Sequence, residues 1–208
     1  MDWRRWHDEY DEAGSGLARR LAAVQDQVRA GLDRCPPGQV RLISLCAGQG
    51  RGVLDVLPDH PRRDDVHARL VELDPRNTAF AQERARGLPQ VEIVTGDAAQ
   101  VDQYDGLVPA DVVLVCGVFG NISDQDIERT IDACPQLCRT GATVIWTRHR
   151  GEPDLVPVIC EWFEARGFER VWVSDPDAGF GVGVHRYAGE PQALVPGRTL
   201  FSFVRGGV

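Results

Sequence analysis

The chain has 208 residues, of which 43% are hydrophobic and 26% are charged, and its formal net charge is −8 at pH 7. This length fits one domain with a sizeable core, and the acidic balance argues against broad electrostatic binding to nucleic acid or to an anionic membrane. No apolar run approaches the roughly 20 residues that span a bilayer, and residues 1–7 lack the apolar segment of a signal peptide. We therefore expect a single cytoplasmic domain over residues 1–208.

Four side chains near the N-terminus recur at helical spacing: Trp3, Trp6, His7 and Tyr10. They fit either a helix packed on the domain or a lid that closes over a ligand, hinged at residues 14–16. Residues 17–32 then form an amphipathic pattern with Arg20 toward water, and Pro36-Pro37-Gly38 ends it. We expect residues 1–38 to form a helical lid or cap segment.

From residue 40 onwards, apolar runs typical of strands alternate with stretches typical of helices. The helices are expected over residues 51–57 and 76–86, from Ser123 or Asp124 onward, and up to Gly167. This alternation predicts an α/β fold with helices on both faces of a mostly parallel sheet. The expected strands are 40–45, 66–73, 91–94, 111–116, 142–147, 168–173 and 180–187, and a weaker pattern allows an eighth at 199–204.

The last two strands are linked only by residues 175–179. So short a link cannot make a parallel crossover, so this pair should be antiparallel. Residues 180–187 are rich in glycine, which marks either a close approach of backbone or ligand or a flexible hairpin. No composition shift marks a domain boundary, so we assign residues 40–190 to the core and 191–208 to a C-terminal tail.

The six cysteines, at positions 35, 46, 116, 134, 138 and 160, are scattered, and several lie in apolar runs. This distribution favours reduced thiols over a disulfide framework. Cys134 and Cys138 lie four residues apart on one expected helix face, but no His or Cys accompanies them at a metal-ligand spacing. We interpret both as core residues and predict no metal site.

Polar groups and glycines follow four neighbouring strands where ligands bind in open α/β sheets. The turn Gly48-Gln49-Gly50 follows the first strand. Glu72 ends the second, where a carboxylate can accept both hydroxyls of a ribose. Asp97 and Ala98 follow the third, where a carboxylate beside a backbone N–H suits adenine, and an apolar turn over 116–121 lies at the end of the fourth. This order favours an adenosine ligand.

The glycine spacing narrows the choice of ligand. Glycines at 48, 50 and 52 form G-x-G-x-G and not the G-x-G-x-x-G of a dinucleotide site, and the absence of G-K-[ST] excludes a P-loop. A nicotinamide-dependent oxidoreductase and a non-catalytic adenosine-binding protein remain as alternatives.

With these motifs in order, the chain resembles the class I S-adenosylmethionine-dependent methyltransferases, with a Rossmann-like sheet of seven strands, over about residues 40–190. Residues 45–50 stand at the family's motif Leu-Gly-x-Gly-x-Gly, 71–74 at its acidic motif, 95–98 at its adenine motif, and 111–117 at the motif bordering the methyl group. The resemblance implies S-adenosylmethionine as cofactor. It implies cofactor contacts from Cys46, Ala47, Gly48, Gln49, Gly50, Glu72, Leu73, Asp74, Gly96, Asp97, Ala98, Cys116, Gly117 and Val118.

Two residues depart from the family pattern. Ser44 stands where an acidic residue is usual, so it can hydrogen-bond the turn but cannot hold an amino group by charge. Cys46 replaces the first motif glycine and adds a side chain where the backbone approaches the methionine half of the cofactor. Both departures bear on how tightly the cofactor binds and not on which cofactor it is. The alternative interpretation is a family member that no longer binds the cofactor.

Methyl transfer depends on positioning, so no obligatory catalytic side chain follows from the fold. His149, after the fifth strand, is the best candidate base by position, and His7 and Tyr10 on the expected lid are further catalytic candidates. Each histidine equally suits a surface or core position, and Asn121 equally suits a turn. The candidate substrate residues are Phe119, Asn121, Arg148 and His185.

The sequence also bears on the acceptor. After the fourth strand it lacks the Asn-Pro-Pro-Tyr or Asp-Pro-Pro-Tyr of amino-methylating nucleic-acid enzymes, and Cys116 lacks the Pro-Cys context of cytosine methylases. Together with the acidic charge, this favours methyl transfer to an oxygen or nitrogen of a small molecule. We expect no nucleic-acid or membrane partner and predict no oligomeric state.

Overall fold

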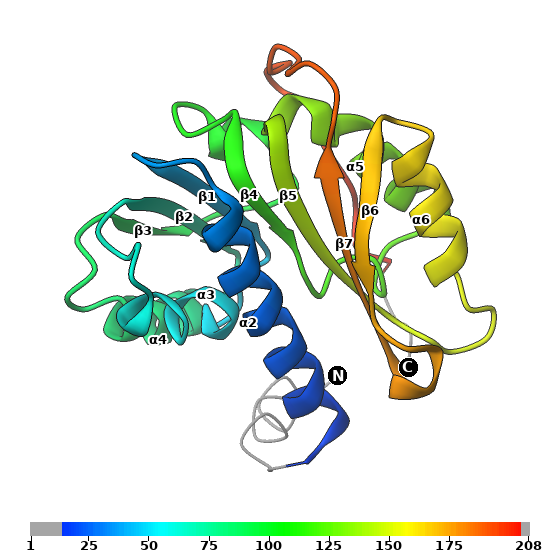
Figure 1. Cartoon of the computed structure of the whole chain (residues 1–208), viewed down its shortest axis with the longest axis horizontal. Helices are drawn as coiled ribbons and strands as arrows, with labels where there is room; N and C mark the ends of the chain where they lie inside the picture. The colour runs from blue at the N-terminus through cyan, green and yellow to red at the C-terminus, as the bar shows by residue number, and fades with distance from the viewer. Residues whose placement is uncertain (1–13, 205–208) are drawn as a thin grey trace.

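A computed structural model describes residues 14–204 and shows one seven-stranded sheet of order β3-β2-β1-β4-β5-β7-β6 (Figure 1). Neighbouring strands from β3 to β5 pair in parallel, whereas β7 is antiparallel to both β5 and β6. The mostly parallel sheet with an antiparallel final pair is thus confirmed. The strands are β1 (Val40–Leu45), β2 (Val66–Glu72), β3 (Val91–Thr95), β4 (Ala110–Val115), β5 (Cys138–His149), β6 (Phe168–Val173) and β7 (Phe180–Tyr187).

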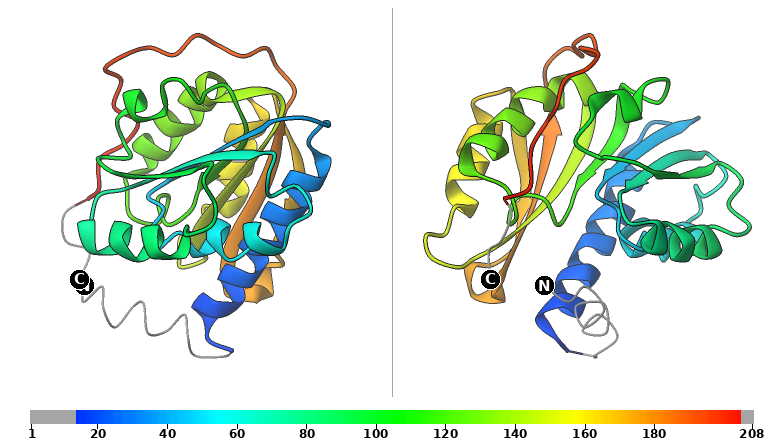
Figure 2. Two further views of the ribbon diagram at one scale, coloured as in Figure 1. Left: turned by 90° about the vertical axis from the view of Figure 1, so that its left-hand side faces the viewer. Right: turned by 180° about the vertical axis from the view of Figure 1, so that it is seen from behind.

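Helices cover both faces of the sheet (Figures 1 and 2). One core cluster joins α2 (Gly16–Arg34), α3 (Arg51–Leu54) and α4 (Pro75–Arg84) to one face. A second cluster joins α5 (Asp124–Leu137) and α6 (Val156–Glu164) to the other. Every residue of β4 is buried, as expected of the central strand. No described helix is long and apolar enough to cross a bilayer.

Side-chain caps explain where three of the helices begin. Ser15 accepts a hydrogen bond from Ala18 N at 3.0 Å, and Ser123 accepts one from Asp126 N at 3.1 Å. Asp74 accepts one from Arg76 N at 2.8 Å and precedes a proline, which suits the first position of α4. Of the two predicted caps of α5, Ser123 is the one used.

Three predictions of local secondary structure are wrong. Cys138 adopts an extended conformation and begins β5, because α5 ends at Leu137, so Cys134 and Cys138 do not share a helix face. The helix predicted at 51–57 is the single turn α3, followed by a 3-10 turn over Leu57–Asp59. The strand allowed at 199–204 is replaced by two isolated bridges, at Thr199 and Phe203. The lid residues His7 and Tyr10 lie outside the described residues.

Residues 192–204 form a strap along the α5 side of the sheet (Figure 2). The backbone of the strap forms hydrogen bonds with several segments in turn and not with one strand. Val101 N donates to Arg198 O, Leu200 N donates to Ala99 O, and Val204 N donates to Asn121 O. A continuous ladder therefore cannot form. The strap ties the loop after β3 to the turn after β4.

An aromatic core lies between β5, β7 and α6. His185 is fully buried, stacks on Phe163 with ring centroids 4.6 Å apart, and accepts a hydrogen bond from Trp146 Nε1 at 3.1 Å. Since no part of His185 reaches solvent, the substrate role predicted for it is wrong. Its imidazole is a packing residue whose Nδ1 satisfies the indole N–H.

His185 should make the fold sensitive to acid. Burial lowers its pKa to about 3, whereas an unfolded histidine titrates near about 6.5. Between these values only the unfolded chain binds this proton, so its contribution to stability is complete above the higher value and declines as the pH falls, by up to about 1.4 kcal/mol per pH unit.

The comparison with His185→Gln isolates this histidine, because glutamine can still accept the indole hydrogen bond. Urea unfolding at a series of pH values from 7 to 4 should show a steeper loss of stability for the wild type. Equal slopes would contradict the buried neutral imidazole.

Candidate functional site

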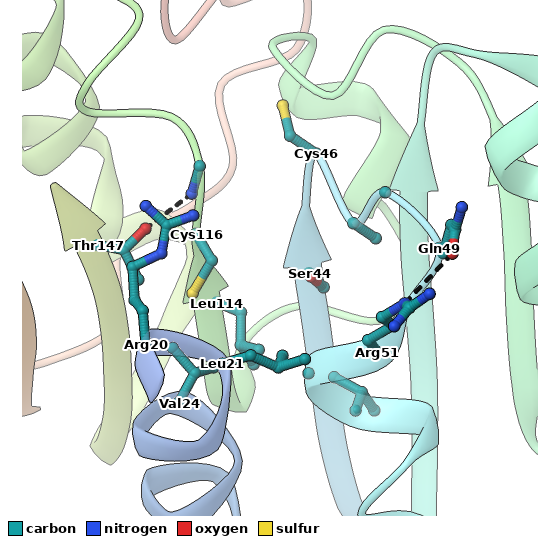
Figure 3. Close-up of a pocket in the computed structure, with 16 residues that line it drawn as sticks. Arg20, Leu21, Val24, Ser44, Cys46, Gln49, Arg51, Leu114, Cys116 and Thr147 are labelled. Carbon is teal, nitrogen blue, oxygen red and sulfur yellow. Dashed lines mark hydrogen bonds between the residues drawn. The ribbon is translucent and has the colours of Figure 1, made fainter. Parts of the chain in front are cut away.

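A pocket lies at the carboxyl ends of β1 and β4, between these strands and α2 (Figure 3). The strand order reverses between β1 and β4, which is where ligands bind in open α/β sheets. Helix α2 contributes Arg20, Leu21 and Val24 to the pocket wall. The other lining residues are Ser44, Cys46, Ala47, Gly48, Gln49, Gly50, Arg51, Gly52, Val53, Leu114, Cys116, Gly117 and Thr147.

The turn after β1 depends on left-handed backbone conformations. Gly48 and Gly50 have φ of 57° and 72°. A Cβ at Gly50 would lie 2.5 Å from Leu54 Cδ1, whereas a Cβ at Gly48 would meet no heavy atom within 4 Å. Gly50 therefore allows the turn to close against α3. Gly48 leaves open space beside its backbone.

Cys46 is the one non-glycine described residue with positive φ, at 51°. A left-handed conformation costs a residue with a Cβ about 1 kcal/mol or more, which explains why a glycine is expected at this position. Cys46 also packs against the core cluster on the α5 side. Burial, with the nearby carboxylates of Glu72 and Asp97, raises the pKa of its thiol, so the thiol is neutral.

Glu72 at the end of β2 joins the strand to the glycine turn. Gly48 N donates to Glu72 Oε2 at 2.8 Å, and Asp74 N donates to Oε1 at 2.9 Å. Each carboxylate oxygen can accept a second hydrogen bond, so the group can still take a pair of hydroxyls. Leu73 is exposed beside it, whereas Asp74 caps α4 and pairs with Arg76 at 2.6 Å.

The loop after β3 is attached to the same edge. Gly96 N donates to Glu72 O at 2.9 Å. Exposed Asp97 accepts hydrogen bonds from Ala99 N at 3.0 Å and from the side chain of Gln100 at 3.1 Å. Tyr104 fixes the buried Ala98 by donating to its carbonyl at 2.8 Å. The structure thus brings the two predicted carboxylates to adjoining strand ends.

The turn after β4 is closed by its own polar groups. Gly117 N donates to Thr147 Oγ1 at 2.8 Å (Figure 3). Asn121 donates from Nδ2 to Gly117 O at 2.9 Å, which makes it a turn residue, one of the two roles expected for it. Val118 and Phe119 are fully buried. The ring of Phe119 packs 6.0 Å from that of Trp146, so a direct substrate contact by this side chain, as predicted, is wrong.

His149 and Arg148 both contact the turn after β4. The ring of His149 lies 3.2 Å from where a Cβ on Gly120 would stand, and its Nδ1 accepts from Gly151 N at 3.1 Å. Burial and the charge of Arg148 lower the pKa of His149, partly opposed by Asp154. A neutral imidazole that accepts at Nδ1 carries its proton on Nε2. In this arrangement His149 presents the Nε2–H group as a hydrogen-bond donor. For His149 to act as a base, the hydrogen bond from Gly151 N to Nδ1 would have to break.

Arg20 and Thr147 are among the pocket residues that were not predicted from the sequence. Arg20 was predicted to face water, yet it lies four residues before the inward Val24 and therefore on the same helix face, a signal that was available. Thr147 interrupts an apolar strand with a hydroxyl at its pocket end. Its partner, Gly117 N, is distant in sequence, so this bond left no local pattern.

The sheet order, the glycine turn and the carboxylate at the end of β2 together define a class I methyltransferase architecture. A family model described as "Putative methyltransferase" matches residues 12–173. The chain belongs to this methyltransferase family, which confirms the resemblance to class I S-adenosylmethionine-dependent enzymes. No curated protein matches the chain in sequence.

Solved structures share the fold at low sequence identity. A 1,6-didemethyltoxoflavin-N1-methyltransferase from Burkholderia thailandensis, with bound 1,6-didemethyltoxoflavin and S-adenosylhomocysteine, is 16% identical with a TM-score of 0.66, over 89% of this chain and 84% of that one. The N-methyltransferase NodS from Bradyrhizobium japonicum WM9, in complex with S-adenosylhomocysteine, is 15% identical with a TM-score of 0.61, over 85% and 89%.

A third similar structure is much longer than this chain. An O-methyltransferase family protein from Burkholderia thailandensis is 16% identical with a TM-score of 0.62, over 82% of this chain. This chain spans 56% of that protein. At such identities these likenesses establish the fold.

Proposed function

We propose that this chain transfers a methyl group from S-adenosylmethionine to an oxygen or nitrogen of a small-molecule acceptor. The observation that carries the proposal is the hydrogen bond from Gly48 N to Glu72, which places a carboxylate with spare acceptor capacity beside an open glycine turn. Such a pair suits a ribose next to a polar chain. The family of the chain supports the reaction class.

The residues present fit the cofactor. The backbone of Gly48, the hydroxyl of Ser44 and the guanidinium of Arg20 would hold its methionine half, since all line one pocket. Glu72 would hold the ribose and Asp97 the adenine, since both carboxylates retain free lone pairs. When bound, the cofactor supplies an electrophilic methyl group. No hydrogen bond joins the Ser44 hydroxyl to another described residue, which leaves it available.

The chain itself orients the acceptor and excludes water. Leu21 and Val24 of α2 form an apolar wall of the pocket. The turn after β4 and the end of β5 would position the acceptor, with His149 Nε2 donating a hydrogen bond to it. A net charge of −8 favours a small acceptor over nucleic acid. The six cysteines are free, which supports a reducing, cytoplasmic setting.

Two measurements test this function. Titration calorimetry with S-adenosylmethionine, S-adenosylhomocysteine and NADH should show micromolar or tighter binding of the first two alone. Incubation of the protein and methyl-labelled S-adenosylmethionine with a cell extract should then label a small molecule that mass spectrometry can identify. A nicotinamide enzyme would prefer NADH, and a non-catalytic binder would bind the cofactor without consuming it, so either result would contradict the proposal.

A further inference from the structure

Arg148 is a buried cation with little to compensate it. Its side chain stands one residue before the end of β5, and the residue is 8% exposed. Nη1 donates to Phe119 O, and buried Nε has no hydrogen-bond partner. No carboxylate of the described residues lies within ion-pair distance. Arg150, two residues along the chain, instead pairs with Asp154 at 2.7 Å and donates to Ser174 O at 2.9 Å.

The nearby carboxylates do not remove this imbalance. Burial lowers the pKa of Arg148, and Asp124 and Asp154 oppose that shift only from a distance. Asp154 is already engaged, because it binds Arg150 and accepts from Val156 N at 3.0 Å. Asp124 is exposed at the start of α5. A charge buried without a partner is destabilising, so a ligand of opposite charge that pairs with Arg148 gains an electrostatic attraction that no described carboxylate already satisfies.

The place of Arg148 in the fold points to the acceptor. Side chains alternate along a strand, so Arg148 points to the opposite face of the sheet from its neighbour Thr147, which lines the pocket. Its Nη1 holds the carbonyl of Phe119 in the turn after β4, and His149 packs against Gly120 in the same turn. The cation and the imidazole therefore both contact the turn after β4, and Gly117 of this turn borders the cofactor pocket.

We propose that the methyl acceptor is a small carboxylic acid and that Arg148 binds its carboxylate. This inference rests on the proposed function and names its substrate class. The planar guanidinium matches the two oxygens of a carboxylate, and the bound acid gives the buried charge its partner. The net charge of −8 disfavours a multiply charged anion in this place.

The test uses the full chain, methyl-labelled S-adenosylmethionine, and a small-molecule extract separated by anion exchange at neutral pH. Label should enter the retained fraction. Amidation of carboxylates in that fraction should abolish labelling, and phosphatase treatment should not. Label confined to the unretained fraction would overturn the inference and leave the proposed function intact, whereas no label in any fraction would contradict both. Loss of labelling on phosphatase treatment would show a phosphate acceptor and also overturn it.

The role of Arg148 is tested with two variants of equal charge change. Arg148→Met should raise the KM for the labelled acceptor at least 10-fold while leaving the affinity for S-adenosylhomocysteine unchanged. Arg86→Met removes an exposed arginine paired with Glu83 and should leave both quantities unchanged. An unaltered KM in Arg148→Met would overturn the inference. Arg148→Lys keeps the positive charge, so its KM for the acceptor should lie between those of the wild type and Arg148→Met. If Arg148→Met proves unstable, the KM of Arg148→Lys separates the effect of the lost charge from an effect of misfolding.

Discussion

Replacing Glu72 with alanine should weaken the binding of S-adenosylhomocysteine by about 1–3 kcal/mol, roughly 5- to 150-fold in Kd. The loss has two sources. The variant removes the carboxylate that would accept the ribose hydroxyls, and it removes the acceptor that holds Gly48 N at 2.8 Å and Asp74 N at 2.9 Å. Titration calorimetry measures the affinity, and thermal unfolding without ligand shows how much of the change arises from the fold.

Matched variants separate the carboxylate from general charge effects. Glu92→Ala removes an exposed carboxylate on the neighbouring strand, where it pairs with Arg69 at 2.7 Å, and should leave the affinity unchanged. Glu72→Gln keeps one acceptor oxygen for Gly48 N but places an amide against Asp74 N, so an intermediate loss is expected. Wild-type affinity in Glu72→Ala would show that the ribose does not bind at the end of β2.

The sheet could be predicted because its signals are local. Alternating strand and helix patterns located all seven strands, and the short link at 175–179 predicted the antiparallel pairing of β6 and β7. The glycine turn and Glu72 were found for the same reason, since each follows directly from its own strand. Their hydrogen bond, between residues 24 apart, follows from the parallel pairing of β1 and β2.

What could not be predicted depends on which side chains meet across the fold. Phe119 and His185 had polar or turn-like surroundings in sequence, but tertiary packing buries both in the aromatic core. The strap escaped prediction because its bridges join residues far apart, such as Gln100 and Thr199. The missing partner of Arg148 is likewise visible only when every neighbouring element is in place.

The glycines of strand β7 were predicted to mark either a close approach of backbone or ligand, or a flexible hairpin. A close approach to the glycine does occur, but the group that approaches is the side chain of Trp146. A Cβ on Gly183 would stand 2.2 Å from Cε2 and Cζ2 of Trp146, on the neighbouring strand β5. The glycine is therefore required by the buried indole.

Gly183→Ala should accordingly lower the free energy of unfolding by about 3 kcal/mol, because a rigid buried ring cannot yield to the added methyl group. Urea unfolding measures this loss. Gly16→Ala is the matched control, since a Cβ there meets nothing within 4 Å and the residue begins α2, so its effect should stay within about 0.5 kcal/mol.

A second substitution decides whether the indole causes the loss. Trp146→Phe shrinks the ring and also removes the N–H that donates to His185, so alone it destabilises the protein. In combination with Gly183→Ala it should cost at least about 1 kcal/mol less than the sum of the two single changes, because the smaller ring leaves room for the methyl group. Strict additivity would show that the strand backbone, and not the contact with Trp146, requires glycine at this position.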